Sequence, residues 1–327
     1  MQKEQNRPNM SDFPVPISFH VFNRPETTRK VFQEIKAIKP CKLFITADGP
    51  RAGVRDDDER CREVRSIVDQ IDWECEVFKN LSEVNKGSYK STSEGITWVF
   101  NHVDKAIILE DDCIPHQSFF KFCSELLDYY KYDLRVTLIT GNCWIENQQS
   151  YQYSYYFSRY TNMWGWATWK NRWQQIDFSM KNWPEFRAKN GLDSVFRKKY
   201  ELDYWNELMQ DLYEGKKGPH WDYLLMLTMF MNNSLAIKPA VNLIKNVGYG
   251  STSTHFSSKN RNIQDKPLRN LNFPLKHPPC IRNYLSIDEH THAMVLGGYN
   301  VYIKKRIKRK LPSFLIYIYK KLRGLFS

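Results

Sequence analysis

The sequence of 327 residues is 42% hydrophobic and 26% charged, with a formal net charge of +12. This composition excludes a disordered chain, and no apolar run approaches the roughly 20 residues that a membrane-spanning helix needs. The seven cysteines are scattered without a C-x-x-C pair, which argues against a disulfide framework and against a zinc site.

The positive charge is concentrated at the C-terminal end. Residues 301–327 contain nine Lys or Arg and no acid, which leaves a net charge of only +3 on the first 300 residues. The body of the protein is nearly neutral, so we expect no nucleic-acid partner. The first 11 residues are polar and lack the apolar stretch of a signal peptide. We therefore expect residues 1–13 to form a disordered leader and the protein to be cytoplasmic.

Strands and helices alternate along the first 140 residues. Apolar runs predict strands at residues 15–22, 42–47, 76–78, 106–109 and 136–140. Helical spacing predicts helices at residues 26–38, 55–71, 91–102 and 119–130. This alternation is typical of βαβ units in an α/β fold with a mostly parallel sheet, whose ligands bind beyond the carboxyl ends of the strands.

The composition changes after residue 141. Six of the ten tryptophans lie between Trp144 and Trp183, among many tyrosines. We expect two halves, residues 14–141 and residues 142–290, of which the second closes over the loops of the first.

Three consecutive carboxylates, Glu110, Asp111 and Asp112, follow the predicted strand at residues 106–109. Like charges so close together repel and raise each other's pKa. A divalent cation removes this penalty, and carboxylate oxygens suit Mn²⁺ or Mg²⁺. Such a metal can bridge a diphosphate and carry charge on a leaving nucleotide. The alternative is a solvated acidic turn at the end of a strand.

The segment IILEDDCIP, residues 107–115, resembles the acidic motif of glycosyltransferases with the GT-A fold. The pattern is most similar to the N-acetylglucosaminyltransferase I type and to related bacterial sugar transferases. Further segments resemble that family in the same order, and together they span about residues 14–256. They are residues 23–25, 47–49, 138–144, 163–169, 221–222 and 247–255.

The resemblance implies a Rossmann-like GT-A fold with a mixed, mostly parallel sheet flanked by helices. It also implies a metal-dependent transfer of a sugar from a nucleotide-diphosphate donor, with UDP favoured, to a glycan or lipid-linked acceptor. The implied metal ligands are Asp112 and His255. The implied donor-binding residues are Arg24, Asp48, Glu110 and Asp111, and the implied acceptor-binding residues are Trp164, Gly165 and Trp166.

Several of these residues have plainer interpretations. Asp48 fits a simple Asp-Gly-Pro turn, and Arg24 fits a surface arginine before a proline. His255 fits a solvated loop histidine, and Trp164 and Trp166 fit buried structural tryptophans.

Inversion at the anomeric carbon needs a general base, and the resemblance points to Asp222. The alternative is that Asp222 is an acid stabilising the N-terminus of the helix it opens. Asp203 and Asp211 are weaker candidates for the base, and a retaining reaction would need no such base.

The C-terminal segment predicts an amphipathic basic helix at residues 301–327. One apolar stripe runs through residues 303, 307, 311, 314, 318, 322 and 325. Such a helix lies on an anionic membrane surface, so we expect peripheral association with the inner face of the membrane. The alternative is a helix packed against the body of the protein.

Two other functions remain open. A sugar nucleotidyltransferase also uses a related sheet and a metal, but residues 22–25 lack the glycine-rich, lysine-containing first loop of those enzymes. A non-catalytic membrane- or nucleic-acid-binding protein with a degenerate GT-A fold would leave the acidic triplet unexplained.

Overall fold

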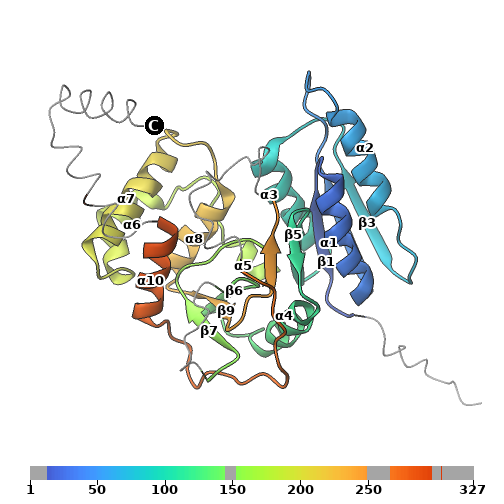
Figure 1. Ribbon diagram of the computed structural model, residues 1–327. Coiled ribbons are helices and arrows are strands. Elements are labelled where there is room, and N and C mark those ends of the chain that lie inside the picture. Colours follow the sequence, from blue (N-terminus) through green and yellow to red (C-terminus); the bar gives the residue numbers. More distant parts are fainter. Residues whose placement is uncertain (1–12, 144–151, 249–265, 297–302, 304–327) are drawn as a thin grey trace, which may run out of the picture.

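The computed structural model describes residues 13–143, 152–248 and 266–296, together with residue 303. In its first part, strands and helices alternate as predicted (Figure 1). The elements there are β1 (Ile17–Val21), α1 (Pro25–Ile38), β2 (Lys42–Ala47), α2 (Asp57–Val68), β3 (Glu76–Leu81), α3 (Gly87–Phe100), β4 (Lys105–Glu110), β5 (Cys113–Pro115), α4 (Gln117–Tyr129) and β6 (Val136–Thr140).

The second part is richer in helices. Its elements are β7 (Tyr155–Ser158), β8 (Trp166–Trp169), α5 (Lys170–Trp173), α6 (Trp183–Ala188), a 3₁₀ helix η1 (Gly191–Ser194), α7 (Lys199–Tyr213), α8 (Trp221–Met231), β9 (Leu235–Pro239), β10 (Ile244–Asn246) and α10 (Leu285–Leu296). Helix α10 crosses the expected domain boundary at residue 290. The predicted tail lies outside the described residues apart from Ile303.

One mixed sheet of eight strands joins the two parts, in the order β3-β2-β1-β4-β8-β6-β9-β7. Strands β3, β2, β1 and β4 pair in parallel, as do β6 and β9. Strand β8 runs antiparallel to β4 and β6, and β7 runs antiparallel to β9. Six of the eight strands therefore point the same way, which confirms the expected α/β class with a mostly parallel mixed sheet.

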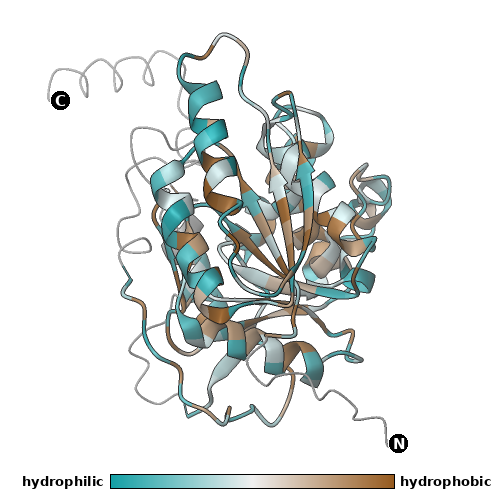
Figure 2. Ribbon diagram, turned by 90° about the vertical axis from the view of Figure 1, so that its right-hand side faces the viewer, coloured by the Kyte–Doolittle hydropathy of each residue, from teal (hydrophilic) through white to brown (hydrophobic). Residues whose placement is uncertain are grey.

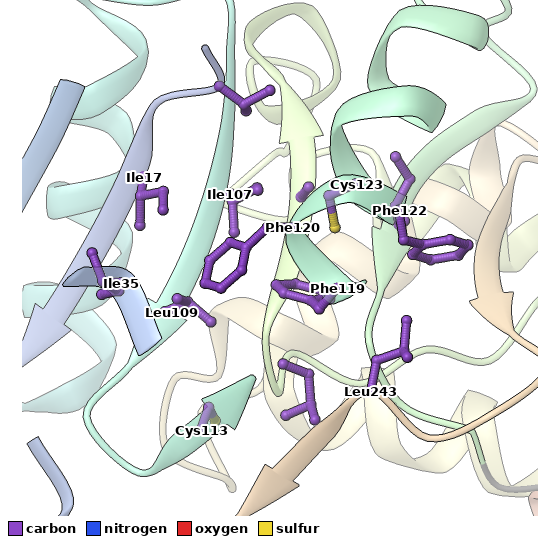
Figure 3. Close-up of a cluster of buried hydrophobic side chains, with 14 of the residues drawn as sticks. Ile17, Ile35, Ile107, Leu109, Cys113, Phe119, Phe120, Phe122, Cys123 and Leu243 are labelled. Atoms are coloured by element: carbon purple, nitrogen blue, oxygen red, sulfur yellow. The ribbon is translucent and has the colours of Figure 1, made fainter. Parts of the chain in front are cut away.

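Side chains point alternately to the two faces of the sheet along each strand. Helices cover both of these faces. On one face the core includes Ile17, Ile107 and Leu109 from the strands and side chains of α1, α2 and α4. Phe119, Phe120 and Phe122 of α4 lie within this core (Figure 3). The strands are coloured hydrophobic while the outer sides of the helices are hydrophilic (Figure 2).

The opposite face is packed by an aromatic core that belongs mostly to the second part. Its tryptophans are Trp166, Trp173, Trp183, Trp205 and Trp221. They pack with Ile108 of β4 and with residues of α3, α7 and α8. Helix α10 is held by polar contacts. The buried Asp288 accepts a hydrogen bond from Ser158 Oγ at 2.6 Å, and His292 Nδ1 lies 3.1 Å from Tyr160 Oη.

A second, two-stranded sheet was not predicted. β5 pairs antiparallel with β10, with Cys113 opposite Asn246. β5 has only three residues, too few to give a periodic signal in the sequence. This pairing brings residues near 246 to the end of β4. Among the described residues, no helix combines the length and apolar character needed to cross a membrane.

Candidate functional site

The acidic triplet lies at the carboxyl end of β4, inside the sheet. Glu110 is the last residue of β4, and Asp111 and Asp112 form the turn into β5. β4 lies between β1, which runs parallel to it, and β8, which runs antiparallel. Asp111 and Asp112 are buried, with 6% and 8% of their surface exposed. The interpretation as a solvated acidic turn therefore does not fit these two residues.

The loop between β1 and α1 contacts two of these carboxylates. The backbone N–H of Phe22 donates to Asp111 Oδ2 at 3.0 Å. Arg24 Nη1 lies 2.6 Å from Asp112 Oδ2 and 3.6 Å from Asp111 Oδ1. Burial by itself would lower the pKa of Arg24, but the charges of Asp111 and Asp112 outweigh it and raise that pKa. Arg24 is thus a partner of the triplet rather than a plain surface arginine.

The end of β10 contacts Asp112 from the other side. The backbone N–H of Val247 donates to the Asp112 carbonyl at 2.8 Å, and Asn246 Nδ2 lies 3.4 Å from Asp112 Oδ1. Asn246 Oδ1 in turn accepts from the N–H of Gly248 at 2.9 Å. A Cβ added to Gly248 would lie 2.0 Å from Asp112 Oδ2. Sequence analysis did not single out Asn246, and it included Gly248 only within residues 247–255, one of the segments that resemble the family.

Negative charge at the triplet is only partly compensated. Desolvation and then the charge of Asp112 raise the pKa of both Glu110 and Asp111. The charge of Asp222 adds to the rise for Glu110, so this carboxylate from α8 belongs to the same electrostatic environment. A nearby positive charge favours the ionised form of a carboxylate, so a cation bound here would oppose these two shifts.

The donor chemistry fits a hard divalent metal, since carboxylate oxygens are its preferred ligands. Within the described ranges, no three His, Cys, Asp or Glu side chains are arranged as a ready-made metal cage. Mg²⁺ in proteins is normally held by one or two carboxylates together with phosphate oxygens. Asp112 is the residue of the triplet that is contacted both by the loop between β1 and α1 and by the end of β10. The second predicted ligand, His255, lies outside the described residues.

Asp48 is buried at the end of β2 and holds a loop together. Its two oxygens accept hydrogen bonds from the backbone N–H groups of Gly49, Lys86 and Gly87 and from Asn85 Nδ2, at 2.8–3.1 Å. Four donors use the approximately four lone-pair positions of a carboxylate. Contact between the Asp48 side chain and a nucleotide base stays a prediction. The visible contacts fix the loop after β2 against the start of α3.

A further buried acid, Asp57, joins the loops after β1 and β2. Arg51 donates to it from Nε at 2.6 Å and from Nη2 at 2.9 Å, and Asn23 Nδ2 donates at 2.7 Å. The hydrogen bond from Arg51 is the main cause that lowers the pKa of Asp57 to about 2. Sequence analysis missed Asp57, because a run of three aspartates at the start of a helix looks like an ordinary charged surface.

Asp222 is the second residue of α8, and 43% of its side chain is exposed. Its Oδ1 lies 3.9 Å from Nδ1 of His220. Asp203 and Asp211, the two weaker candidates, both lie on α7, where Asp203 forms an ion pair with Lys199 one turn away, at 2.9 Å. Of these candidates, Asp222 is the one whose charge contributes to the raised pKa of Glu110.

The three predicted acceptor-binding residues have different environments. Trp166 is fully buried, with its ring stacked on Trp221 at 5.8 Å, so it presents no face to an acceptor. Gly165 has φ of +61°, and a Cβ there would lie 2.4 Å from Ile244 Cδ1. Its role visible here is to let β8 pass close to β10. Trp164 is half-buried and is the member of the three that keeps exposed surface.

We expect Gly248→Ala to displace the Asp112 carboxylate, since the new methyl group would overlap Oδ2. Affinity for Mn²⁺ in the presence of UDP should fall about tenfold or more, as when a group supporting a metal ligand is lost. Isothermal titration calorimetry measures this. Gly218→Ala is the matched control, because nothing lies within 4 Å of its Cβ position. Unchanged Mn²⁺ affinity in Gly248→Ala would contradict the placement of the metal at Asp112.

Comparison with known proteins finds no matching family model and no curated protein with matching sequence. The structure is similar to a cytidylyltransferase from Leptospira borgpetersenii, at 12% identity and a TM-score of 0.28, covering 64% of this chain and 73% of that one. It is similar to a UDP-glucose pyrophosphorylase complexed with UDP-glucose, at 8% identity and a TM-score of 0.29, covering 50% and 78%. It is also similar to mouse xyloside xylosyltransferase 1 in its apo form, at 11% identity and a TM-score of 0.33, covering 67% and 82%. Likeness at this level assigns neither fold nor function, so the functional assignment depends on the site.

Proposed function

We propose that this protein is a metal-dependent glycosyltransferase that moves a sugar from a nucleotide-diphosphate donor, UDP-linked by preference, to a glycan or lipid-linked acceptor. The observation that carries the proposal is the set of buried carboxylates at the end of β4, whose negative charge Arg24 compensates only in part. A divalent cation supplies the missing positive charge and matches the ligand chemistry of that position, and the same cation can bind the diphosphate of the donor.

In this proposal Asp112 holds the metal, with His255 as the second ligand implied by the family resemblance. The metal, when bound, stabilises the negative charge that develops on the departing nucleotide. Arg24 lies beside Asp112 and can donate paired hydrogen bonds to a phosphate. Glu110 and Asp111 complete the donor site on the ribose side. The narrower assignment to the N-acetylglucosaminyltransferase I type remains part of the proposal, since it rests on the sequence motif alone.

In the transfer step Asp222 is the general base. Its carboxylate takes the proton of an acceptor hydroxyl, whose oxygen bonds to the anomeric carbon as the bond from that carbon to the phosphate oxygen breaks. The nucleotide leaves with that bonding electron pair, and the anomeric configuration inverts. Trp164 keeps exposed surface on the loop before β8 and is the aromatic residue available to an acceptor sugar.

A sugar nucleotidyltransferase is the nearest alternative. The loop between β1 and α1, Phe22-Asn23-Arg24, contains neither glycine nor lysine, and its arginine pairs with Asp112. Slow, metal-dependent hydrolysis of a nucleotide sugar in the absence of acceptor separates the possibilities. We expect it of a glycosyltransferase, whereas neither a nucleotidyltransferase nor a non-catalytic protein should show it.

The direct test of the donor site is Asp112→Asn. We expect the wild-type protein to gain thermal stability from UDP with Mn²⁺, because a ligand at a hundredfold excess over Kd adds about 2.7 kcal/mol to the free energy of unfolding. The variant should keep its fold and lose this stabilisation. Asp128→Asn is the control, since Asp128 is exposed on α4 and pairs with Lys105 away from the triplet. If Asp112→Asn binds UDP with unchanged metal dependence, the proposed metal site is wrong.

The test of the base is Asp222→Asn. Donor affinity should be retained, and kcat should fall about 10²- to 10⁴-fold, because the base acts on the acceptor proton alone. Asp203→Asn provides the control, because that carboxylate already pairs with Lys199 on the protein surface. NMR of the product reports the anomeric configuration. Retention of configuration, or near wild-type turnover in Asp222→Asn, would remove Asp222 as the base.

We also propose that residues 301–327 attach the enzyme to an anionic membrane surface. The motive is the charge distribution, +9 in that segment against +3 in the rest. A chain ending at residue 300 keeps the contacts of Asp288 and His292 that hold α10, so the body should remain folded.

We expect the truncated protein not to bind anionic vesicles, since each basic residue near such a surface contributes about 1 kcal/mol to the free energy of binding. It should still act on a soluble acceptor analogue. Sedimentation with vesicles at low and high salt measures binding, and salt should weaken binding of the full-length protein. Equal sedimentation of the two forms would exclude the anchor. Failure of the shorter form to fold would instead favour a tail packed on the body.

A further inference from the structure

Arg24 makes a partly buried ion pair with Asp112. The side chains of Arg24 and Asp112 are 27% and 11% exposed, and Nη1 lies 2.6 Å from Oδ2. Arg29, one turn further along α1, offers a comparison. Its ion pair with Glu63 leaves both side chains about half exposed, at 52% and 50%. Exposed pairs of that kind contribute little, whereas a pair out of water, with a charge-assisted hydrogen bond, is considerably stronger.

The carboxylate held by Arg24 is the one that the proposed function gives to the metal. A guanidinium in hydrogen-bond contact with Asp112 Oδ2 and a divalent cation bound to the same carboxylate would stand only a few ångströms apart. Two cations at that separation repel each other strongly in a partly buried site. Occupation of Asp112 by Arg24 and by a metal is therefore competitive.

We propose that Arg24 is the internal counter-ion of the metal site, which neutralises Asp112 in the absence of ligand and transfers to the diphosphate when a metal nucleotide binds. The inference rests on the proposed function for the second half of this exchange. Its first half rests on the Arg24–Asp112 contact alone.

The local structure allows the side chain to move while the backbone stays fixed. The carbonyl of Arg24 accepts hydrogen bonds from Thr28 N at 3.0 Å, Thr28 Oγ1 at 2.7 Å and Thr27 Oγ1 at 3.2 Å. Pro25 follows at the first position of α1, where its fixed φ suits the helix. The exchange is thus a change of side-chain rotamer at an anchored residue. A guanidinium remains charged throughout, so the counter-ion moves rather than titrates.

A counter-ion that exchanges couples the two ligands. Mn²⁺ alone must displace Arg24 from Asp112, whereas Mn²⁺ together with a diphosphate gives the guanidinium a new anionic partner. Linkage then requires that UDP raise the affinity for Mn²⁺ and that Mn²⁺ raise the affinity for UDP by the same factor. Removing the guanidinium should affect the two binding steps in opposite directions, which loss of a merely structural contact would not do.

The experiment measures Mn²⁺ affinity by electron paramagnetic resonance, without nucleotide and with saturating UDP, in the full chain and its variants. Arg24→Gln should bind Mn²⁺ alone about tenfold more tightly than wild type, the effect of one charge-assisted hydrogen bond to Asp112. The same variant should bind UDP about tenfold more weakly in saturating Mn²⁺. Arg29→Gln is the control and should change neither affinity.

Arg24→Lys keeps the experiment decisive if Arg24→Gln does not fold. Lysine retains a cation beside Asp112, so affinity for Mn²⁺ alone should stay within about threefold of wild type, while the paired donors to phosphate are lost. Tighter Mn²⁺ binding in Arg24→Lys would show that the positive charge at position 24 does not compete with Mn²⁺ for Asp112, and would overturn the proposal. Unchanged or weaker binding of Mn²⁺ alone in Arg24→Gln would overturn it as well.

The two arms separate this inference from the proposed function. If no variant binds UDP while Arg24→Gln still gains Mn²⁺ affinity, the counter-ion at Asp112 stands, and the nucleotide-dependent function and the transfer to diphosphate both fail. If UDP binds in all variants with Mn²⁺ while Arg24→Gln gains no Mn²⁺ affinity, the donor site stands and the counter-ion is wrong.

Discussion

The burial of several carboxylates at the end of one central strand is the constraint on which the arrangement of this site depends. Charged groups taken out of water must be compensated, and the protein does this from two directions. A backbone N–H and a guanidinium reach the triplet from the loop after β1, and an amide and a backbone N–H reach it from the end of β10. The small β5–β10 sheet brings the second set of donors to Asp112.

The carboxylates at this edge of the sheet fall into two groups with different surroundings. Asp48 and Asp57 accept several hydrogen bonds each from nearby loops, and for Asp57 these donors lower the pKa to about 2. They fix the loops after β1 and β2. Glu110 and Asp111 have fewer donors and have their pKa raised by desolvation and then by the charge of Asp112. Donor-saturated acids suit a structural role, and undercompensated acids suit a bound cation.

The second part of the chain supplies the position of Asp222. Trp166 of β8 stacks on Trp221, the first residue of α8, so the aromatic core connects the sheet beside β4 to the helix that carries Asp222. Trp173 packs against the same two rings. Two tryptophans of the tryptophan-rich segment, Trp166 and Trp173, therefore help to fix α8. Trp164, which is half-buried, is the one that the proposed function assigns to the acceptor.

The sequence by itself determined the elements of the first half and the location of the acidic triplet. Apolar runs and helical spacing are local properties, so β1, β2, β4 and the helices between them follow from residues that lie next to one another. The break from apolar strand to three acids is local as well, and it marked the triplet as a candidate site without any knowledge of packing. The fold class followed from the same alternation of strands and helices.

Only the tertiary structure decided which partners those acids have. Asn246 and Gly248 meet Asp112 across more than 130 residues of sequence, and β5 becomes a strand only by pairing with β10. The same holds for Asp48, whose donors lie at the start of α3, and for Trp166, whose burial depends on Trp221. Hydrogen bonds and charge compensation at a buried site depend on distances in space. A pattern read along the chain gives the chemical groups, and the packing of the sheet decides which of them meet.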